Sequence, residues 1–258
     1  MTLPSDMGAD LEDKVALVTG GATRLGAQIS RTLANAGAIV AIHCHRSLAA
    51  AEDLVEEIES IGGEAFVVRG DLSEEEDRAN LIDSVIERAG RLDILVNNAS
   101  IFEKIPLEDM TSDAAQMMWR VNAEAPLMLI QHAAPHLRFE GVDQPGCVIN
   151  MLDNASGRRD WPEFSHYCAS KAALLSITRS LAQELAPSIR VNAVGPGAIL
   201  FQEWESEQRR DAVLSSIPME RQGSAEEIAE TVLFLVCGPS YITGQIIDVD
   251  GGWSLTSS

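Results

Sequence analysis

Residues 15–47 read as a strand, a glycine-rich turn, a helix and a second strand, in the order of a nucleotide-binding half-unit. The strand VALVTG leads into Gly20-Gly21-Ala22-Thr23-Arg24-Leu25-Gly26, and the strand IVAIH follows the helix. A glycine turn between a buried strand and a helix lets a phosphate group rest on the helix N-terminus. The alternative is a tight turn without a ligand. The order of the elements favours a dinucleotide site that includes Gly20, Arg24, Leu25 and Gly26.

The end of the second strand indicates which dinucleotide is bound. An NAD-specific protein places an Asp or Glu about 20 residues after the turn, where it bonds the ribose 2′-hydroxyl. This chain has His45, Arg46 and Ser47 there. A guanidinium can bond a 2′-phosphate bidentately, whereas a carboxylate would repel it. We therefore expect NADPH or NADP+ as the cofactor.

Charge and composition exclude several classes of partner. The 258 residues carry a formal net charge of −20, which argues against nucleic acid or an anionic membrane surface. No run approaches the ~18 apolar residues of a membrane span, and the N-terminus lacks the features of a secretory signal. The four cysteines are scattered without a C-x-x-C pair, which predicts neither a metal site nor a disulfide framework. We expect a cytoplasmic protein.

Short apolar runs alternate with helical patterns along the whole chain. Strands are predicted at 15–19, 39–43, 65–69, 93–96, 147–151, 189–194 and 245–249. Helical patterns occupy 25–36, 48–61, 74–89, 112–137, 165–186 and 225–237. Continuous apolar strands between helices predict one doubly wound α/β (Rossmann) domain, with a parallel seven-stranded sheet and helices on both faces. The domain should span residues 13–258, after a flexible tail at 1–12.

Ligands of such sheets bind outside the carboxyl ends of the strands. Polar or glycine-rich residues recur at these ends. They are Asp71 and Leu72 after the third strand, Asn98, Ala99 and Ser100 after the fourth, Asp153 and Asn154 after the fifth, and Pro196 and Gly197 after the sixth. We therefore expect one site shared across the strands.

Tyr167 and Lys171 are predicted to open the helix after the fifth strand. Residues four apart lie on one helix face, so the phenol and the ammonium can point into the same crevice. A phenol with an ordinary pKa near ~10 is a poor acid–base group at neutral pH. A nearby cation should lower that pKa toward the working range. An isolated Tyr/Lys pair at this spacing is usually an ordinary surface pair. Because Tyr167 and Lys171 follow a dinucleotide-binding turn, the catalytic interpretation is favoured.

These motifs resemble the short-chain dehydrogenase/reductase superfamily. The matching features are T-G-x-x-x-x-x-G at Thr19, the N-N-A triplet, Asn122 in the following helix, Y-x-x-x-K, and P-G. The similarity covers about residues 14–253. The resemblance implies that Tyr167 donates a proton, that Lys171 holds the nicotinamide ribose and lowers the tyrosine pKa, and that Asn122 supports a water-linked relay.

Departures from the superfamily point to a subgroup. Arg24 stands where most members have a third glycine, and Asp153 lies near the usual position of a serine that holds a substrate carbonyl. The chain resembles the pteridine reductases at several of these positions. They are Arg24, His45-Arg46-Ser47, Asn98-Ala99-Ser100 with Phe102, and the Asn-Met-x-Asp run at 150–153. The runs from Tyr241 and Asp248 and the segment from Pro196 also resemble that group, which includes bacterial dihydromonapterin reductases. The resemblance implies a pterin substrate.

The chemistry of the site suits a pterin. A flat ring can stack on an aromatic face such as Phe102, and its N–H edge needs an acceptor such as the Asp153 carboxylate. Arg24 and Ser100 are further candidates for substrate contacts, together with Tyr167. A carbonyl reductase needs a neutral donor at the developing oxyanion, so Asp153 argues against ordinary ketones.

Several residues have alternative interpretations. Phe102 could be plain loop packing. Asp153 and Asp71 could each cap a local turn, although the resemblance has Asp71 bonding adenine. Residues 202–210, with Trp204, are expected to form a substrate-covering loop and helix. His43, His132 and His136 lack metal spacing and are interpreted as structural.

The leading hypothesis is NADPH-dependent reduction of dihydromonapterin, dihydrobiopterin or a related dihydropterin, with dihydrofolate possible as a substrate. The first alternative is a ketoreductase, such as a 3-oxoacyl carrier-protein reductase, in which Ser156 would replace Asp153. The second is an NADPH-binding regulator, which would not need Tyr167, Lys171 and Asn122. The resemblance also implies a homotetramer formed through the helices at 112–137 and 165–186 and the C-terminal strand.

Overall fold

The computed structural model describes residues 11–137, 145–154, 161–201 and 205–256. Seven strands form one sheet in the order β3-β2-β1-β4-β5-β6-β7, and every neighbouring pair is parallel. The strands are β1 (Val15–Val18), β2 (Ile39–Cys44), β3 (Glu64–Arg69), β4 (Ile94–Asn97), β5 (Gly146–Met151), β6 (Ile189–Pro196) and β7 (Ile246–Val249). The predicted fold class is confirmed.

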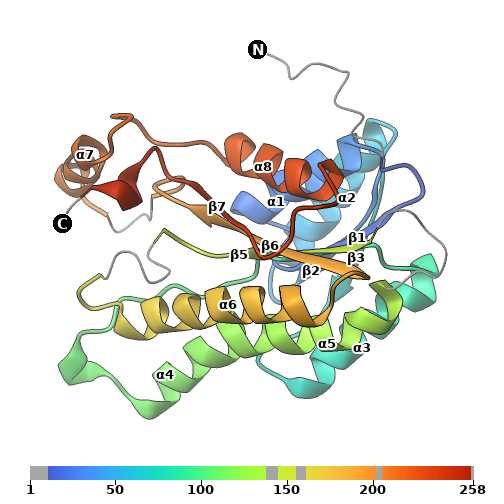
Figure 1. Ribbon diagram of the computed structural model, residues 1–258, viewed down its shortest axis with the longest axis horizontal. Helices are drawn as coiled ribbons and strands as arrows, with labels where there is room; N and C mark the ends of the chain where they lie inside the picture. Colours follow the sequence, from blue (N-terminus) through green and yellow to red (C-terminus); the bar gives the residue numbers. More distant parts are fainter. Residues whose placement is uncertain (1–10, 138–144, 155–160, 202–204, 257–258) are drawn as a thin grey trace.

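Helices cover both faces of the sheet (Figure 1). The face shown uppermost carries α1 (Arg24–Asn35), α2 (Leu48–Ser60) and α8 (Ala225–Cys237). The opposite face carries α3 (Glu75–Ala89), α5 (Ala125–Leu137) and α6 (Ser165–Glu184). Short elements complete the fold: α4 (Ser112–Trp119), α7 (Glu207–Ser216) and the 3₁₀ turns Leu107–Asp109 and Trp253–Leu255.

The alternating side chains of the buried strands form a separate core on each face. Ala16 and Val18 of β1 point into the α1/α2/α8 layer, where they pack with Ile29, Leu33 and Val232. Val15 and Leu17 point into the other layer, which includes Leu129 of α5. This arrangement explains why β1 is apolar at every position: a strand covered on both faces has no side exposed to water.

The helix predicted at 112–137 is interrupted. A π-helical segment, Arg120–Glu124, separates α4 from α5. A π turn adds one residue per turn, so it rotates the side chains on either side relative to one another. Hydrophobic periodicity at a spacing of 3.6 residues does not reveal such a local change. Asn122, one of the predicted site residues, lies within this segment.

Apart from the interrupted helix, the ends of the predicted strands and helices agree with the structure to within two residues. Gly37 and Gly62 follow α1 and α2 with positive φ values of 99° and 88°, and Gly90 caps α3 in the left-handed conformation at 75°. These are the positions where a helix C-terminus favours glycine. Within the described residues, no helix combines the length and apolar character needed to cross a membrane.

Candidate active site

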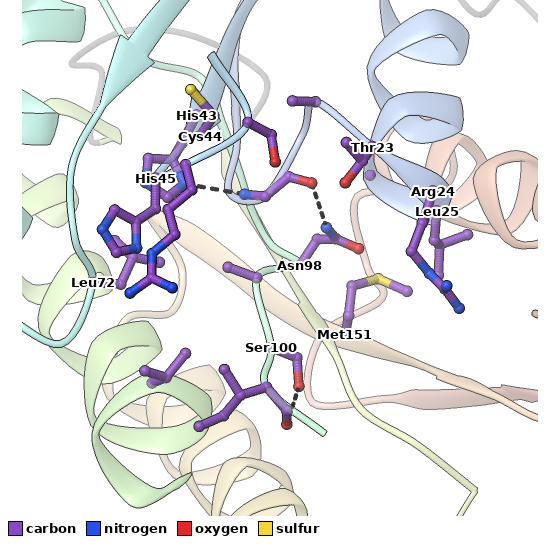
Figure 2. A pocket seen from close by; sticks show the side chains of 18 of the residues that line it. Thr23, Arg24, Leu25, His43, Cys44, His45, Leu72, Asn98, Ser100 and Met151 are labelled. Atoms are coloured by element: carbon purple, nitrogen blue, oxygen red, sulfur yellow. Dashed lines mark hydrogen bonds between the residues drawn. The ribbon is translucent and has the colours of Figure 1, made fainter. Parts of the chain in front are cut away.

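A cavity of about 700 Å³ opens at the carboxyl ends of the strands. Its lining includes most of the predicted site residues: Gly20, Arg24, Leu25, Gly26, His45, Arg46, Ser47, Asp71, Leu72, Asn98, Ala99, Ser100, Asp153, Tyr167, Lys171 and Pro196. Figure 2 shows part of this lining, with the glycine turn and Asn98 between His45 on one side and Arg24 on the other. The structure therefore brings residues from six strand ends together, β1 to β6.

Tight packing shapes the glycine turn. Gly20 has a φ of +60°, and a Cβ on Gly26 would collide with the carbonyl oxygen of Gly20 and the amide of Asn98. The Asn98 side chain donates hydrogen bonds to the carbonyl oxygens of Thr19 (2.9 Å) and Gly20 (3.2 Å), as Figure 2 indicates for the turn. These contacts hold the turn against the end of β4.

The first turn of α1 is available to an anion. Its N-cap residue, Thr23, makes no side-chain cap, and the turn contains no acidic residue. The backbone N–H groups at a helix N-terminus and the helix dipole both favour negative charge. Together with the Arg24 cation in the cavity lining, this end of the cavity fits a phosphate group of a dinucleotide.

Arg24 adopts the left-handed conformation, with a φ of +51°. This conformation is strained for a residue with a Cβ and ordinary for glycine, the residue that the resemblance implies at this position. The side chain donates a 3.3 Å hydrogen bond to the carbonyl oxygen of Leu200, just beyond β6. Arg24 therefore connects the nucleotide turn to the start of the expected substrate-covering segment.

At the other end of the cavity, His45, Arg46 and Ser47 follow β2, next to Asp71. The Asp71 carboxylate accepts hydrogen bonds from the Ser73 backbone (2.9 Å) and hydroxyl (2.8 Å), so the turn-capping interpretation is correct. Burial raises the pKa of Asp71, but the Ser73 bonds and the charges of His45 and Arg46 outweigh it, and the net pKa is lowered. The contact with adenine remains an expectation.

Tyr167 and Lys171 project from the same face of α6 into the cavity, as predicted. The Tyr167 hydroxyl donates a 2.8 Å hydrogen bond to Oδ2 of Asp153. The Lys171 ammonium donates a 2.9 Å bond to the carbonyl oxygen of Met151 and lies 5.8 Å from the centre of the Tyr167 ring. The hydrogen-bond partner of the Tyr167 hydroxyl is therefore the Asp153 carboxylate, whereas the Lys171 ammonium bonds a backbone carbonyl.

The expected lowering of the tyrosine pKa is wrong for this arrangement. Burial raises the pKa of Tyr167 well above its ordinary value of 10, and the charge and hydrogen bond of Asp153 add to the increase. Burial lowers the pKa of Lys171 to about 8, although Asp153 partly opposes the change. At neutral pH the phenol is therefore protonated and can donate a proton.

Asn122 has a positioning role. Its side-chain oxygen accepts hydrogen bonds from the Ile101 backbone (2.9 Å) and the Ser100 hydroxyl (3.1 Å). Its nitrogen donates to the carbonyl oxygen of Ile101 (2.9 Å) and to Ser170 (3.2 Å). Fully buried, the amide ties the π-helical segment to the end of β4 and to α6. Its side chain lies outside the cavity lining, and the water-linked relay that the resemblance implies for Asn122 stays a prediction.

Two further expectations need correction. The Phe102 ring stacks on Phe164 at 4.6 Å and packs against the edge of Tyr167 at 4.7 Å, instead of lining the cavity. Phe102 is therefore packed in the loop, and its stacking on a substrate stays a prediction. Gly197 also lies outside the lining; a Cβ there would meet the backbone of Asp250 at 2.6 Å, so its glycine is a packing requirement.

The cavity also contains residues that the motifs did not indicate. Ile101, Glu103, Met117 and Val121 form part of the lining, and their loop and helix positions carry no recognisable pattern. His43 lines the nucleotide end, although we interpreted it as structural. Ser156 and Trp204, like residues 202–203 of the expected substrate loop, lie outside the described residues. The helical part of that segment is α7.

Comparison with known proteins identifies the family. A family model described as enoyl-(acyl carrier protein) reductase matches residues 20–254. A 3-oxoacyl-[acyl-carrier-protein] reductase, FabG, from Staphylococcus aureus is 35% identical over 93% of this chain and 97% of the relative. The fold, the Y-x-x-x-K pair and these matches define an oxidoreductase. The chain belongs to the short-chain dehydrogenase/reductase family.

Two solved structures resemble the chain over nearly its full length. FolM alternative dihydrofolate reductase 1 from Brucella canis, complexed with NADP, has a TM-score of 0.89 and 36% identity, with 97% of each chain covered. A blue fluorescent protein from a metagenomic library, in complex with NADPH, has a TM-score of 0.86 and 33% identity, with 95% of this chain and 99% of the other covered.

Proposed function

We propose that this protein is an NADPH-dependent reductase of dihydropterins, including dihydromonapterin and dihydrobiopterin. The observation that carries the proposal is the 2.8 Å hydrogen bond between Tyr167 and Asp153. It puts a carboxylate at the proton donor, where a carbonyl reductase needs hydrogen-bond donors and no negative charge beside a developing oxyanion. Protonation of a ring nitrogen develops no such negative charge, so the carboxylate is compatible with reduction of a C=N bond.

NADP(H) is the cofactor, and separate parts of the cavity suit its separate chemical groups. The turn from Gly20 to Gly26 suits the pyrophosphate, and Arg46 with Ser47 suits the 2′-phosphate. Leu72 borders the adenine end, and Lys171 borders the nicotinamide end. When bound, the reduced nicotinamide supplies the hydride equivalent. The Brucella canis neighbour complexed with NADP supports this assignment.

Proton transfer to the substrate depends on Tyr167, Lys171 and Asp153. Tyr167 stays protonated at neutral pH because its pKa is raised, so it can donate to the substrate nitrogen. The Lys171 ammonium, 5.8 Å from the ring centre, would then stabilise the phenolate that remains. Asp153 has two tasks: to accept hydrogen bonds from the amino and ring N–H groups of the pterin, and to relay a proton back to Tyr167.

The second candidate is a 3-oxoacyl thioester reductase, favoured by the Staphylococcus aureus relative. The two candidates differ in the product formed. Incubation with NADPH and dihydrobiopterin or dihydromonapterin should give the tetrahydropterin, identified by mass, whereas the Tyr167→Phe variant should not. Conversion of an acetoacetyl thioester to the hydroxy thioester, with no tetrahydropterin, would establish the second candidate instead.

We also propose a homotetramer, as the family resemblance implies. Met117 and Trp119 are 42% and 45% exposed, and both lie on α4, within the 112–137 segment expected at the interface. β7 occupies the edge of the sheet and is only half-buried, and an open edge is a common site of pairing. Analytical ultracentrifugation tests this: a single monomeric species at micromolar concentration would contradict it.

A further inference from the structure

His43 occupies a central position among the strands that form the nucleotide end of the cavity. It lies in β2, between β1 and β3 in the sheet, and is 2% exposed. Its Nδ1 accepts a 3.0 Å hydrogen bond from the backbone N–H of Gly20, which Figure 2 shows as the dashed line to the glycine turn. Its Nε2 lies 3.1 Å from the carbonyl oxygen of Gly70.

These two partners determine the protonation of the ring. A backbone N–H can only donate and a carbonyl can only accept, so the proton is on Nε2 and Nδ1 is free to accept. The groups whose charges act on the ring are His45, Asp71 and Asp77. Burial dominates over these charges and lowers the pKa of His43 to about 4. The imidazole is therefore neutral, and both of its nitrogens are engaged.

The backbone around His43 completes the connection. The N–H of Gly21 donates to the carbonyl oxygen of His43 at 2.9 Å. The N–H of Gly70 donates to the carbonyl oxygen of Cys44, the next residue of β2, at 3.2 Å. One residue of β2 thus joins the glycine turn after β1 to the Gly70–Leu72 turn after β3. The proposed function assigns the pyrophosphate to the first turn and adenine to the second.

We infer that His43 is a positioning residue for the nucleotide, holding the phosphate-binding turn at a fixed distance from the adenine-side turn. This inference rests on the nucleotide site of the proposed function and not on its substrate. Gly20 has a positive φ and no side chain, so hydrogen bonds to its backbone fix its orientation: its carbonyl oxygen accepts from Asn98, and its N–H donates to His43. Without that acceptor, the partly buried N–H of Gly20 loses its partner, which favours a rearrangement of the turn.

The role of His43 differs from that of Arg46 in a measurable way. Both turns held by His43 face parts that NADP+ and NAD+ share, namely the pyrophosphate and adenine. Arg46 lines the cavity, and the proposed function assigns it to the 2′-phosphate, which NADP+ has and NAD+ lacks. Changes at His43 should therefore weaken both nucleotides by a similar factor, whereas changes at Arg46 should weaken NADP+ selectively.

The test is calorimetric titration of the full-length protein with NADP+ and with NAD+, which requires no substrate. His43→Leu removes both side-chain hydrogen bonds at similar volume, and should raise both dissociation constants roughly tenfold or more. The ratio of the two constants should stay within about threefold of the unmodified protein. The matched control, Arg46→Leu, should raise the constant for NADP+ and leave that for NAD+ nearly unchanged.

Two conservative variants keep the test decisive if His43→Leu does not fold. Asn carries an oxygen near the position of Nδ1, so His43→Asn can still accept from Gly20. Gln reaches the position of Nε2, so His43→Gln can retain only the bond to Gly70. We expect His43→Asn to bind both nucleotides more tightly than His43→Gln. Unchanged dissociation constants in both variants, or a loss confined to NADP+, would overturn the inference.

Discussion

The Tyr167 hydroxyl and the Asp153 carboxylate are joined by a 2.8 Å hydrogen bond across the gap between α6 and the end of β5. Asp153 lies beyond Met151, the last residue of β5, and Tyr167 lies in the first turn of α6. Because the carboxylate directly contacts the proton donor, it affects both the pKa of the phenol and the substrates that the phenol can serve.

Replacement of Asp153 should therefore change substrate preference. Asp153→Ala should reduce dihydropterin turnover by roughly 10²-fold or more, because the relay and the acceptor for the ring are both lost. Asp153→Ser should admit small ketones, because a hydroxyl can bond an oxyanion that a carboxylate repels. Steady-state kinetics with both substrate classes measure this. Binding of NADP+ is the control and should be nearly unaffected, since the residues proposed to hold its phosphates follow other strands.

Tyr167→Phe should lower turnover by roughly 10²-fold or more, as expected from the loss of a general acid. NADP+ affinity should change little, because the variant keeps the ring. Lys171→Ala should impair both turnover and binding, because it removes the buried cation at the nicotinamide end of the cavity. A Tyr167→Phe enzyme with near-normal turnover would show that the proton comes from another group.

Arg46→Asp should weaken NADPH binding by roughly 10- to 100-fold, or about 1.4 to 3 kcal/mol, because it removes a charge-assisted contact and adds repulsion. NADH binding should change far less. Fluorescence titration with both nucleotides gives the two constants. Equal affinity of the unmodified protein for NADH and NADPH would contradict the assignment of this end of the cavity.

The free energy of unfolding should decrease as the pH falls from about 6.5 to about 4, in part through His43. The pKa of His43 is about 4 in the folded protein and 6.5 as its ordinary value. Between these values the unfolded chain binds a proton that the folded protein does not, so stability rises with pH across this window, by at most about 3 kcal/mol. Urea denaturation at several pH values measures the slope. His43→Gln should reduce it, and an identical slope in that variant would contradict the assignment.

Phe102→Ala should lower stability and turnover by removing a ring that packs against Phe164 and Tyr167. The ring contacts Phe164 and the edge of Tyr167, so its loss should reduce stability by about 1–3 kcal/mol and also lower turnover, since Tyr167 loses a supporting contact. Thermal denaturation and kinetics measure the two effects. A raised KM for the pterin with unchanged stability would instead indicate direct stacking on the substrate.

The sequence could predict the features that depend on local pattern. The strands are short, mainly apolar runs between helical patterns, so they were recognisable, and the glycine turn, Arg46 and the Tyr167/Lys171 pair have fixed spacings. The proximity of Asp153 to Tyr167 was also expected, because strand ends share one edge of the sheet. These features follow from backbone geometry that a short segment largely determines.

Features that depend on tertiary packing could not be predicted. The position of the Phe102 ring depends on Phe164, which is distant in sequence, and the raised pKa of Tyr167 depends on burial that no motif encodes. The role of His43 is similar: a lone histidine in a strand reveals nothing until Gly20 and Gly70 are known to lie on either side of it.

The most direct test of the central claim is the specificity of the unmodified protein, expressed as kcat/KM with saturating NADPH. Dihydrobiopterin, dihydromonapterin, dihydrofolate and an acetoacetyl thioester should be compared under one set of conditions. The Asp153–Tyr167 pair predicts that at least one of the two dihydropterins is reduced with a kcat/KM at least roughly 10²-fold above that of the thioester. Turnover of the thioester alone would contradict the account.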